Sequence, residues 1–364
     1  MGLKLFSLSA IALLLATTPA WGDRVPLIFD DRYLEAAPDP RIEAWLAPQL
    51  HVGIEAHTTA VESLAFVGEG VGLISGGGYN DGYLRVWSVE TGRQQQALRA
   101  QRTAVTDLVV SADGEIIASS GNDTGLNLWQ WWRDKDEIRE NHLFQEANNN
   151  ILALAITPDS EVLVSGGLDG IRLWNLRTRK PIYTLARFDN ATYALAIHPN
   201  GYIVASGGQN GRVTLWNVRT GNAIAQHTVH DDTVTVLAFT ADGNTLITGS
   251  EDRTIKVWDF PTLTLQHTLI GHTGEIRALT IHHSGEIFAS GSRDGIRLWY
   301  LDRGTLMTYW YAHDDWVQSL AFSPTGDTLA SGGFDGRVKL WRPLGLPLHL
   351  DPTYLQSQKE DPQY

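Results

Sequence analysis

An all-β fold built from seven similar units is predicted by three features of the sequence. The first is a tryptophan that recurs every 41 to 45 residues, as Trp87, Trp129, Trp174, Trp216, Trp258, Trp299 and Trp341. The second is a series of short apolar runs between these tryptophans, divided by turns such as Asn200-Gly201 and Asp242-Gly243. The third is that runs such as ILALAI at 151–156 are apolar on both faces, which suits sheets covered on both sides. Units of this kind must stack on their neighbours.

Composition excludes several classes of function. The chain has 364 residues, of which 43% are hydrophobic and 19% are charged, so it can bury a large core. Its formal net charge of −13 argues against a protein that binds nucleic acid, because an acidic surface repels phosphates. The absence of cysteine excludes disulfides, thiolate metal sites and cysteine nucleophiles.

Residues 1–22 have the features of a secretory signal peptide. Lys4 precedes an apolar run from Leu5 to Ala16, a break at 17–19 follows, and small residues occupy positions 20 and 22. The apolar run is shorter than the roughly 20 residues that a membrane span needs. We therefore expect cleavage before Asp23 and an exported mature protein, periplasmic or secreted, with no membrane span. An exported chain without cysteine fits a bacterial pattern.

The last repeat shows the unit clearly. It begins with AHDDW at Ala312 and continues through VQSLAF, TLASGG and RVKLW to Trp341. An outer strand precedes each unit, for example LMTYWYA at 306–312. The stretch from Gln49 to Ile54 occupies this place before the first unit, so we expect it to complete the last sheet and close a ring. Residues 23–48 and 343–364 are an N-terminal extension and a C-terminal tail, expected to be ordered only where they touch the ring.

These units resemble the repeats of the WD-repeat β-propeller family, over residues 49–342. The resemblance rests on four residues at fixed spacing: His230, Thr248, Asp252 and Trp258 in the fifth unit, and His313, Ser331, Asp335 and Trp341 in the seventh. It implies a seven-bladed β-propeller of four-stranded antiparallel blades, closed by an N-terminal strand. It also implies that each set forms a hydrogen-bonded network inside its blade, where a buried tryptophan N–H needs an acceptor.

The network is less complete in some of the other blades. Blades one and six keep all four residues, with altered turn lengths. At the histidine position, blade two has Gln101, blade three has Ala147 and blade four has Phe188. We therefore expect blades two to four to form the less rigid half of the ring.

Several clusters suggest chemistry but are better explained by structure. His230 and His313 are each followed by two aspartates, yet both histidines belong to the network. His282 and His283 have no third zinc ligand nearby in the sequence. The Ser–His–Asp sets repeat from blade to blade, whereas a nucleophile needs one exposed hydroxyl and an oxyanion hole. No catalytic residue, cofactor site or metal site is predicted.

Register places other residues on the loop face of the ring, at three and five residues after the histidine and directly before the turn aspartate. In blades six and seven these positions hold Trp316, Phe334, Arg277, Arg293, Gln318 and Glu275. Tryptophan and arginine dominate many interfaces, so we interpret these residues as a partner-binding surface. Alternatively, Trp316 and Phe334 pack on loop backbone while the arginines pair with Glu275.

The sequence thus predicts a monomeric, non-enzymatic scaffold outside the cytoplasm that binds a protein or peptide through its loop face. One alternative is a propeller enzyme, a hydrolase or lyase, with a site in the central channel. Register places only Glu62, Arg277 and Gln318 near that channel. Another alternative is a module that binds carbohydrate or the cell envelope.

Overall fold

The computed structural model describes residues 39–344, apart from 123–124, 136, 145–149 and 187–190. The predicted signal peptide at 1–22 lies outside the described residues. The same holds for residues 23–38 of the predicted extension and 345–364 of the predicted tail.

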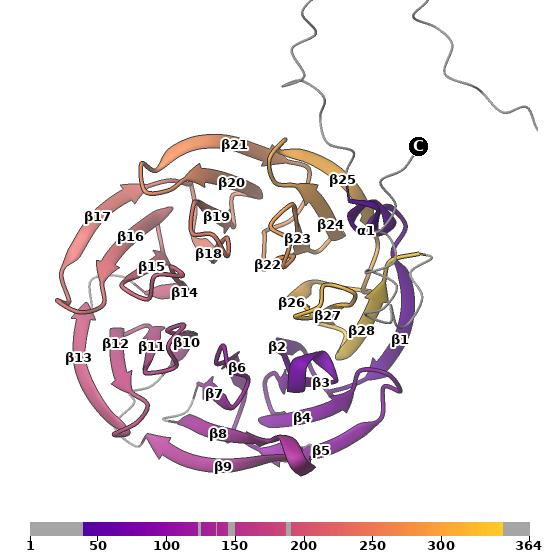
Figure 1. Cartoon of the computed structure of the whole chain (residues 1–364), viewed down its shortest axis with the longest axis horizontal. Coiled ribbons are helices and arrows are strands. Elements are labelled where there is room, and N and C mark those ends of the chain that lie inside the picture. The colour runs from indigo at the N-terminus through magenta and orange to yellow at the C-terminus, as the bar shows by residue number, and fades with distance from the viewer. Residues whose placement is uncertain (1–38, 123–124, 136, 145–149, 187–190, 345–364) are drawn as a thin grey trace, which may run out of the picture. The chain divides into compact units, whose positions relative to one another are not determined.

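Seven four-stranded antiparallel sheets surround a central channel as the blades of a ring, which confirms the predicted fold class (Figure 1). Blades one to three, from the channel outward, are β2 (Val61–Val67), β3 (Gly72–Gly77), β4 (Tyr83–Ser88) and β5 (Gln94–Arg99); β6 (Val105–Val110), β7 (Ile116–Gly121), β8 (Leu126–Trp132) and β9 (Glu137–Phe144); and β10 (Ile151–Ile156), β11 (Val162–Gly167), β12 (Gly170–Asn175) and β13 (Lys180–Ala186). Blades four to six are β14 (Thr192–Ile197), β15 (Ile203–Gly208), β16 (Arg212–Asn217) and β17 (Ala223–Thr228); β18 (Val234–Phe239), β19 (Thr245–Ser250), β20 (Thr254–Asp259) and β21 (Thr264–Ile270); and β22 (Ala278–Ile281), β23 (Ile287–Ser292), β24 (Gly295–Tyr300) and β25 (Thr305–Trp310).

Blade seven joins the two ends of the repeat region, as predicted. Its inner strands are β26 (Val317–Phe322), β27 (Leu329–Gly333) and β28 (Arg337–Arg342), and its outer strand is β1 (Gln49–Glu55) from the start of the ring. β1 pairs antiparallel with β28, with Ile54 opposite Val338 and Leu50 opposite Trp341. The ring therefore closes through backbone hydrogen bonds and leaves no blade one strand short.

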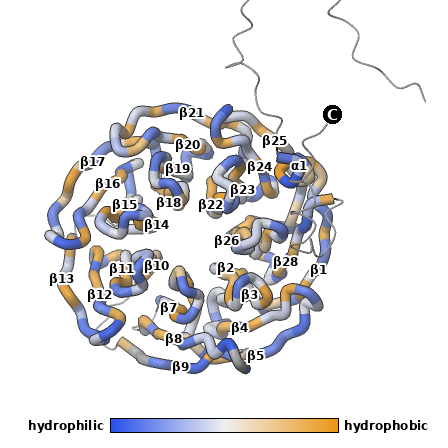
Figure 2. The backbone as a smooth tube through the Cα atoms, viewed as in Figure 1, coloured by the Kyte–Doolittle hydropathy of each residue, from blue (hydrophilic) through white to orange (hydrophobic). Residues whose placement is uncertain are grey.

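Neighbouring blades pack through apolar side chains, and hydrophobic residues are distributed around the whole ring (Figure 2). A glycine in the second strand of a blade faces a branched side chain from the next blade. A Cβ on Gly332 would lie 2.6 Å from Val61 Cγ1, and one on Gly76 would lie 2.7 Å from Val105 Cγ1. The glycines of the repeated SGG runs are thus needed for close approach between blades.

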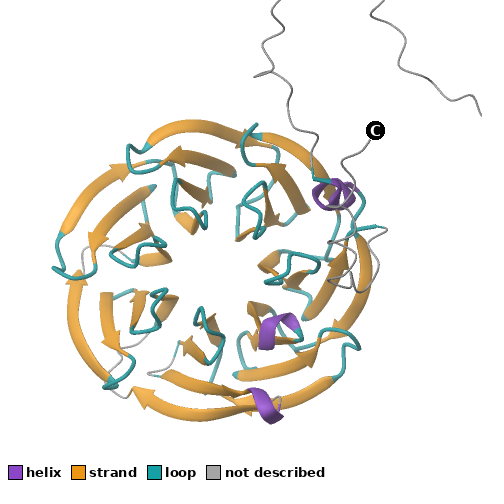
Figure 3. Cartoon of the chain, viewed as in Figure 1, coloured by secondary structure: helices purple, strands orange, loops and turns teal. Residues whose placement is uncertain are grey.

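Within the described residues, helical turns are few and short (Figure 3). Two of them, η3 (Gly68–Gly70) and η4 (Arg133–Lys135), belong to loops of blades one and two. The others, α1 (Pro40–Glu43) and η2 (Ala44–Leu46), precede β1, and they carry Ile42 and Trp45, each only 1% exposed. Both side chains join the core of blades six and seven, where the Trp45 ring meets Phe322 edge-on at 5.4 Å. This part of the N-terminal extension is therefore a piece of the folded ring.

Candidate functional site

The four-residue network is present in blades five and seven. In blade five, His230 Nδ1 lies 2.8 Å from Asp252 Oδ2, His230 Nε2 lies 2.6 Å from Thr248 Oγ1, and Trp258 Nε1 donates to the same hydroxyl at 3.1 Å. In blade seven, His313 lies 3.0 Å from Asp335 Oδ1 and 2.8 Å from Ser331 Oγ, and Trp341 Nε1 donates to that hydroxyl at 2.9 Å. Both histidine side chains are fully buried, so their bonding capacity is used inside the blade.

Blades one and six contain the same set. His57 lies 2.7 Å from Ser75 Oγ and 3.1 Å from Asp81 Oδ2, and His272 lies 2.7 Å from Ser290 Oγ and 2.6 Å from Asp294 Oδ1. Burial lowers the pKa of His57 to about 4, an effect strengthened by the nearby Arg85. Burial also lowers the pKa of His230 and of His272. These imidazoles are therefore neutral at physiological pH.

Blades two to four keep only part of the network. Their tryptophans donate to a serine hydroxyl in every case: Trp129 to Ser119, Trp174 to Ser165 and Trp216 to Ser206, at 2.8–2.9 Å. In blade two, Gln101 Nε2 donates to the Gly125 carbonyl at 2.9 Å. Ala147 and Phe188, predicted at the histidine positions of blades three and four, lie outside the described residues.

His230, His282 and His313, which suggested metal or acid–base chemistry, use both ring nitrogens in hydrogen bonds within the fold. His282 is buried, with Nδ1 2.8 Å from Ser284 Oγ and Nε2 3.1 Å from the Gly326 carbonyl oxygen. The network serines Ser75, Ser290 and Ser331 are fully buried, so a substrate has no access to their hydroxyls. Nothing in these arrangements exposes an activated nucleophile.

On the loop face, the structure brings together residues of blades six and seven. The Arg277 guanidinium lies 5.4 Å from the centre of the Trp316 ring and also pairs with Glu275. An atom at the Cβ position of Gly274 would lie 3.2 Å from both the Trp316 ring and Arg293 Cβ, so these two side chains flank one point. We call Arg277, Arg293, Trp316 and Phe334 the loop-face patch.

The patch is partly exposed. Phe334 is 52% exposed, and its backbone N–H donates to the Trp316 carbonyl at 2.8 Å, which holds the two residues side by side. Arg277 and Arg293 are exposed, and Trp316 is half-buried. Arg277 pairs with Glu275, as the packing alternative anticipated, whereas Arg293 makes no ion pair among the described residues. The patch thus offers two aromatic surfaces and an uncompensated cation.

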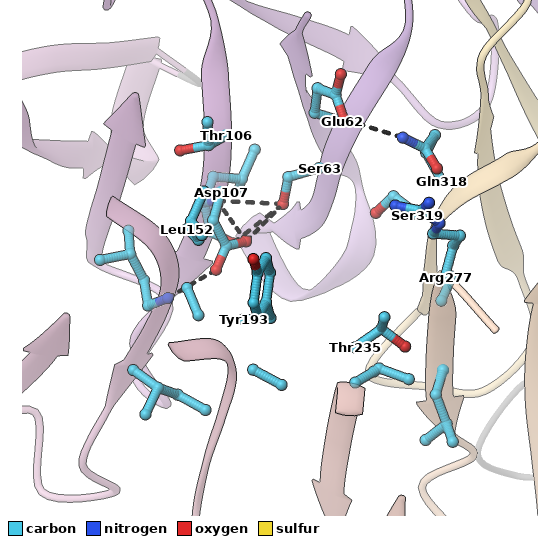
Figure 4. Close-up of a pocket in the computed structure, with 18 of the residues that line it drawn as sticks. Glu62, Ser63, Thr106, Asp107, Leu152, Tyr193, Thr235, Arg277, Gln318 and Ser319 are labelled. Atoms are coloured by element: carbon cyan, nitrogen blue, oxygen red, sulfur yellow. Dashed lines mark hydrogen bonds between the residues drawn. The ribbon is translucent and has the colours of Figure 1, made fainter. Parts of the chain in front are cut away.

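Gln318 lies on the channel wall, where its Nε2 donates to Glu62 Oε2 at 3.2 Å (Figure 4). The channel contains a cavity of about 270 Å³ that all seven inner strands line. Seven residues at equivalent positions form one layer of its wall: Glu62, Thr106, Leu152, Tyr193, Thr235, Arg277 and Gln318. The sequence placed three of them near the channel, Glu62, Arg277 and Gln318. It did not place Thr235 there, nor Thr106, Leu152 and Tyr193, whose blades lack the histidine that marks the register.

A second carboxylate lies deeper in the channel. Asp107 accepts hydrogen bonds from the Leu154 N–H at 2.7 Å, the Leu108 N–H at 2.8 Å and the Ser63 hydroxyl at 3.0 Å, and so joins blades one, two and three. Loss of solvation raises its pKa to about 6 despite these bonds. Sequence reasoning missed this residue, since an isolated aspartate in an inner strand carries no motif.

A ring of seven four-stranded blades, each with a tryptophan that donates to a Ser or Thr hydroxyl, defines the class of WD-repeat propellers. The family model for the WD domain, G-beta repeat, matches the chain seven times, at residues 48–88, 92–130, 139–175, 179–217, 221–259, 263–299 and 304–342. The chain therefore belongs to this family.

The similar proteins come from fungi, plants and animals. The chain is 26% identical to the nuclear distribution protein PAC1 of Arthroderma otae over 82% of its own length and 62% of that protein. It is 29% identical to periodic tryptophan protein 2 of Arabidopsis thaliana over 71% of its length and 24% of that protein. It is 40% identical to rat coronin-7, over 24% of its length and 10% of that protein. The chain thus spans less than two thirds of each relative, and these relatives lend no support to an exported, bacterial type of protein.

One further finding bears on membrane association. Within the part of the chain that the structure describes, no helix combines the length and the apolar character needed to cross a bilayer.

Proposed function

We propose that this protein is a non-enzymatic scaffold that binds another protein or a peptide through the loop-face patch. The observation that carries the proposal is the clustering of Trp316, Arg277, Arg293 and Phe334 on two adjacent blades, none of them used by the hydrogen-bonded networks. Aromatic residues and arginine supply most of the energy at protein interfaces. The fixed loops beneath the patch lower the entropic cost of binding.

The test compares three tryptophans. A partner captured from the host with the full chain is identified and purified, and its affinity is measured by calorimetry for the wild type and each variant. Trp316→Ala should weaken binding about thirty-fold, or about 2 kcal/mol, at unchanged melting temperature. Trp341→Ala should instead lower stability, because Trp341 is buried and bonded to Ser331.

Trp132→Ala is the matched control. Trp132 is 43% exposed and carries Arg139 over its ring at 4.5 Å, so it reproduces the Trp–Arg pair on the outside of blade two. It should bind the partner as the wild type does. The proposal fails if Trp316→Ala keeps its partner or if it melts early.

We further propose that the protein works outside the cytoplasm, in the periplasm or as a secreted protein. The support is the signal-peptide pattern of residues 1–22. N-terminal sequencing of protein from the native host should find Asp23 first. Intact Met1 on cytoplasmic protein would contradict the proposal.

A further inference from the structure

Two opposite charges face the mouth of the channel without contacting each other. Glu62 extends from β2, Arg277 lies directly before β22, and Gln318 of β26 lies between them (Figure 4). Gln318 donates to Glu62, and Arg277 pairs with Glu275. Among the described residues, no ion pair joins Glu62 to Arg277. Each charge therefore retains bonding capacity toward the same cavity.

The Glu62 carboxylate has few hydrogen-bond donors to replace the water that it loses in the channel mouth. The Gln318 amide is its one hydrogen-bond donor among the described residues. The loop of blade one carries two extra residues and passes close by, so that a Cβ on Gly78 would lie 2.8 Å from Glu62 Oε1. Burial raises the pKa of Glu62 in spite of Gln318 and Arg277. A cationic group brought to this carboxylate would offset the lost solvation.

Arg277 has donors to spare. A guanidinium carries five N–H groups in a planar fork. Glu275 accepts from Nη2, and Trp316 lies against the guanidinium at a distance of 5.4 Å from ring centre to Cζ. These contacts fix the plane of the group and leave other donors free for a carboxylate. The Gln318 amide oxygen also has no donor among the described residues, because its Nε2 faces Glu62.

The cavity limits the size of a ligand. The mouth encloses about 310 Å³ and the channel below it about 270 Å³, at or below the lower end of small-molecule sites. Leu152 and Tyr193 supply apolar and aromatic surface across the channel from the charged wall, and Tyr79 adds to the lining of the mouth (Figure 1). A ligand with a single charge would pair with only one of Glu62 and Arg277. A small molecule that carries both charges would pair with both.

We propose that the channel mouth binds a small α-amino acid as its zwitterion. The ammonium group lies on Glu62 and the Gln318 carbonyl, and the carboxylate lies on Arg277. The side chain of the amino acid contacts Tyr193 and Leu152. This site shares Arg277 with the loop-face patch but uses none of its other residues, and it does not depend on a protein partner.

The test uses the twenty L-α-amino acids as probes. Each is screened against the full chain by thermal shift, and the strongest is measured by calorimetry together with its methyl ester and its N-acetyl derivative. We expect at least one amino acid to bind with a Kd below about 1 mM. We expect the ester, which lacks the anion, and the N-acetyl form, which lacks the cation, each to bind at least tenfold more weakly.

The variants locate the site. Glu62→Gln and Arg277→Met should each weaken binding of the strongest amino acid at least tenfold at unchanged melting temperature. Glu161→Gln, a like change at an exposed turn of blade three, should have no effect. Phe334→Ala should also have none, although it belongs to the loop-face patch, and this separates the two proposals.

Three results would overturn the proposal. Absence of binding by all twenty amino acids at 10 mM, on the order of ten times the expected limit, would reject a zwitterion site. Equal binding of the methyl ester would reduce the site to a cation pocket. Full affinity in Arg277→Met would do the same. If Arg277→Met melts early, Arg277→Lys, which keeps the charge and loses the planar fork, should still weaken binding.

Discussion

Blades five, six, seven and one differ from blades two, three and four in how their loops are held. In the first group, the turn aspartate pairs with the histidine and also accepts from the backbone N–H of the residue that follows the histidine. Asp335 accepts from Asp314 N at 3.3 Å, and Asp252 accepts from Asp231 N at 3.1 Å. In the second group, the described residues keep the Trp–Ser bond without the His–Asp pair. The hydrogen bond from the tryptophan to a Ser or Thr hydroxyl is thus common to every blade. The His–Asp pair adds a second set of bonds that holds the loop next to the histidine. The loop-face patch lies on two blades of the fixed group.

The largest effect should come from removing the strand that completes blade seven. Deletion of residues 1–55 removes α1, η2 and β1, so that β28 becomes an exposed edge and the pocket for Ile42 and Trp45 is empty. We expect aggregation and loss of a cooperative melting transition. Deletion of residues 1–38 is the control, and it should melt as the full chain does. Equal melting of both variants would mean that β1 is dispensable for closure.

The histidine pair can be tested directly by comparing the two groups. His313→Ala leaves Asp335 and Ser331 without their buried partner, so it should lower the free energy of unfolding by about 2–4 kcal/mol. Gln101→Ala in blade two removes the bonds of its Nε2 to the Gly125 and Ser119 carbonyls and should cost about 1 kcal/mol. Denaturant unfolding measures both. A cost for Gln101→Ala equal to that for His313→Ala would erase the distinction between the groups.

A fall in pH should change the stability of the fold in opposite directions through one residue of each group, His57 in blade one and Asp107 in blade two. The pKa of His57 falls from 6.5 to about 4 on folding, so the unfolded chain binds the extra proton and stability is lost as the pH falls from 6.5 toward 4. The pKa of Asp107 rises from 3.8 to about 6, so stability from this group is full below pH 3.8 and is lost as the pH rises through 6. Each shift corresponds to about 3 kcal/mol at 1.36 kcal/mol per pH unit.

These two opposing contributions can be separated by measuring how the melting temperature changes with pH. Asp107→Asn should remove the gain in stability that the wild type obtains at low pH, so its melting temperature should fall more steeply between pH 6.5 and 4. His57→Gln should flatten the same profile. Thermal melts across this range measure both slopes, and parallel profiles for Asp107→Asn and the wild type would contradict the role of Asp107.

The smallest difference between the two groups is expected where neighbouring blades pack against each other. Gly332→Ala would place a Cβ 2.6 Å from Val61 Cγ1, and Gly166→Ala would place one 2.6 Å from Thr192 Cγ2. Each should cost about 1–3 kcal/mol because blades cannot separate locally. Gly53→Ala meets nothing within 4 Å and should be neutral. Unequal costs for Gly332→Ala and Gly166→Ala would show that packing between blades also differs.

The blades and their closure could be predicted because the signals are local. The Trp spacing, the turn residues and the place of Gln49–Ile54 before His57 depend on short stretches of chain. Contacts that depend on three-dimensional packing could not be predicted. Nothing in the sequence pairs Ile42 and Trp45 with the core formed by residues 278–341, and Tyr79 reaches the channel through an insertion that breaks the repeat.

The candidate site was only partly predictable for the same reason. Register from His272 and His313 correctly brought Arg277 next to Trp316. It also placed Gln318 near the channel, but its bond to Glu62 of blade one depends on how the ring closes. The loop-face role of these residues stays a prediction until a partner is measured.

The pairing of β1 with β28 sets the order in which the protein can mature. β1 is translated before any blade, and its partner strand is the last part of the ring to leave the ribosome. At about 5–20 residues per second, the first strand waits tens of seconds for a partner. During that time the nascent chain carries an unsatisfied strand that neighbouring chains could capture. The ring therefore closes only after β28 has been made.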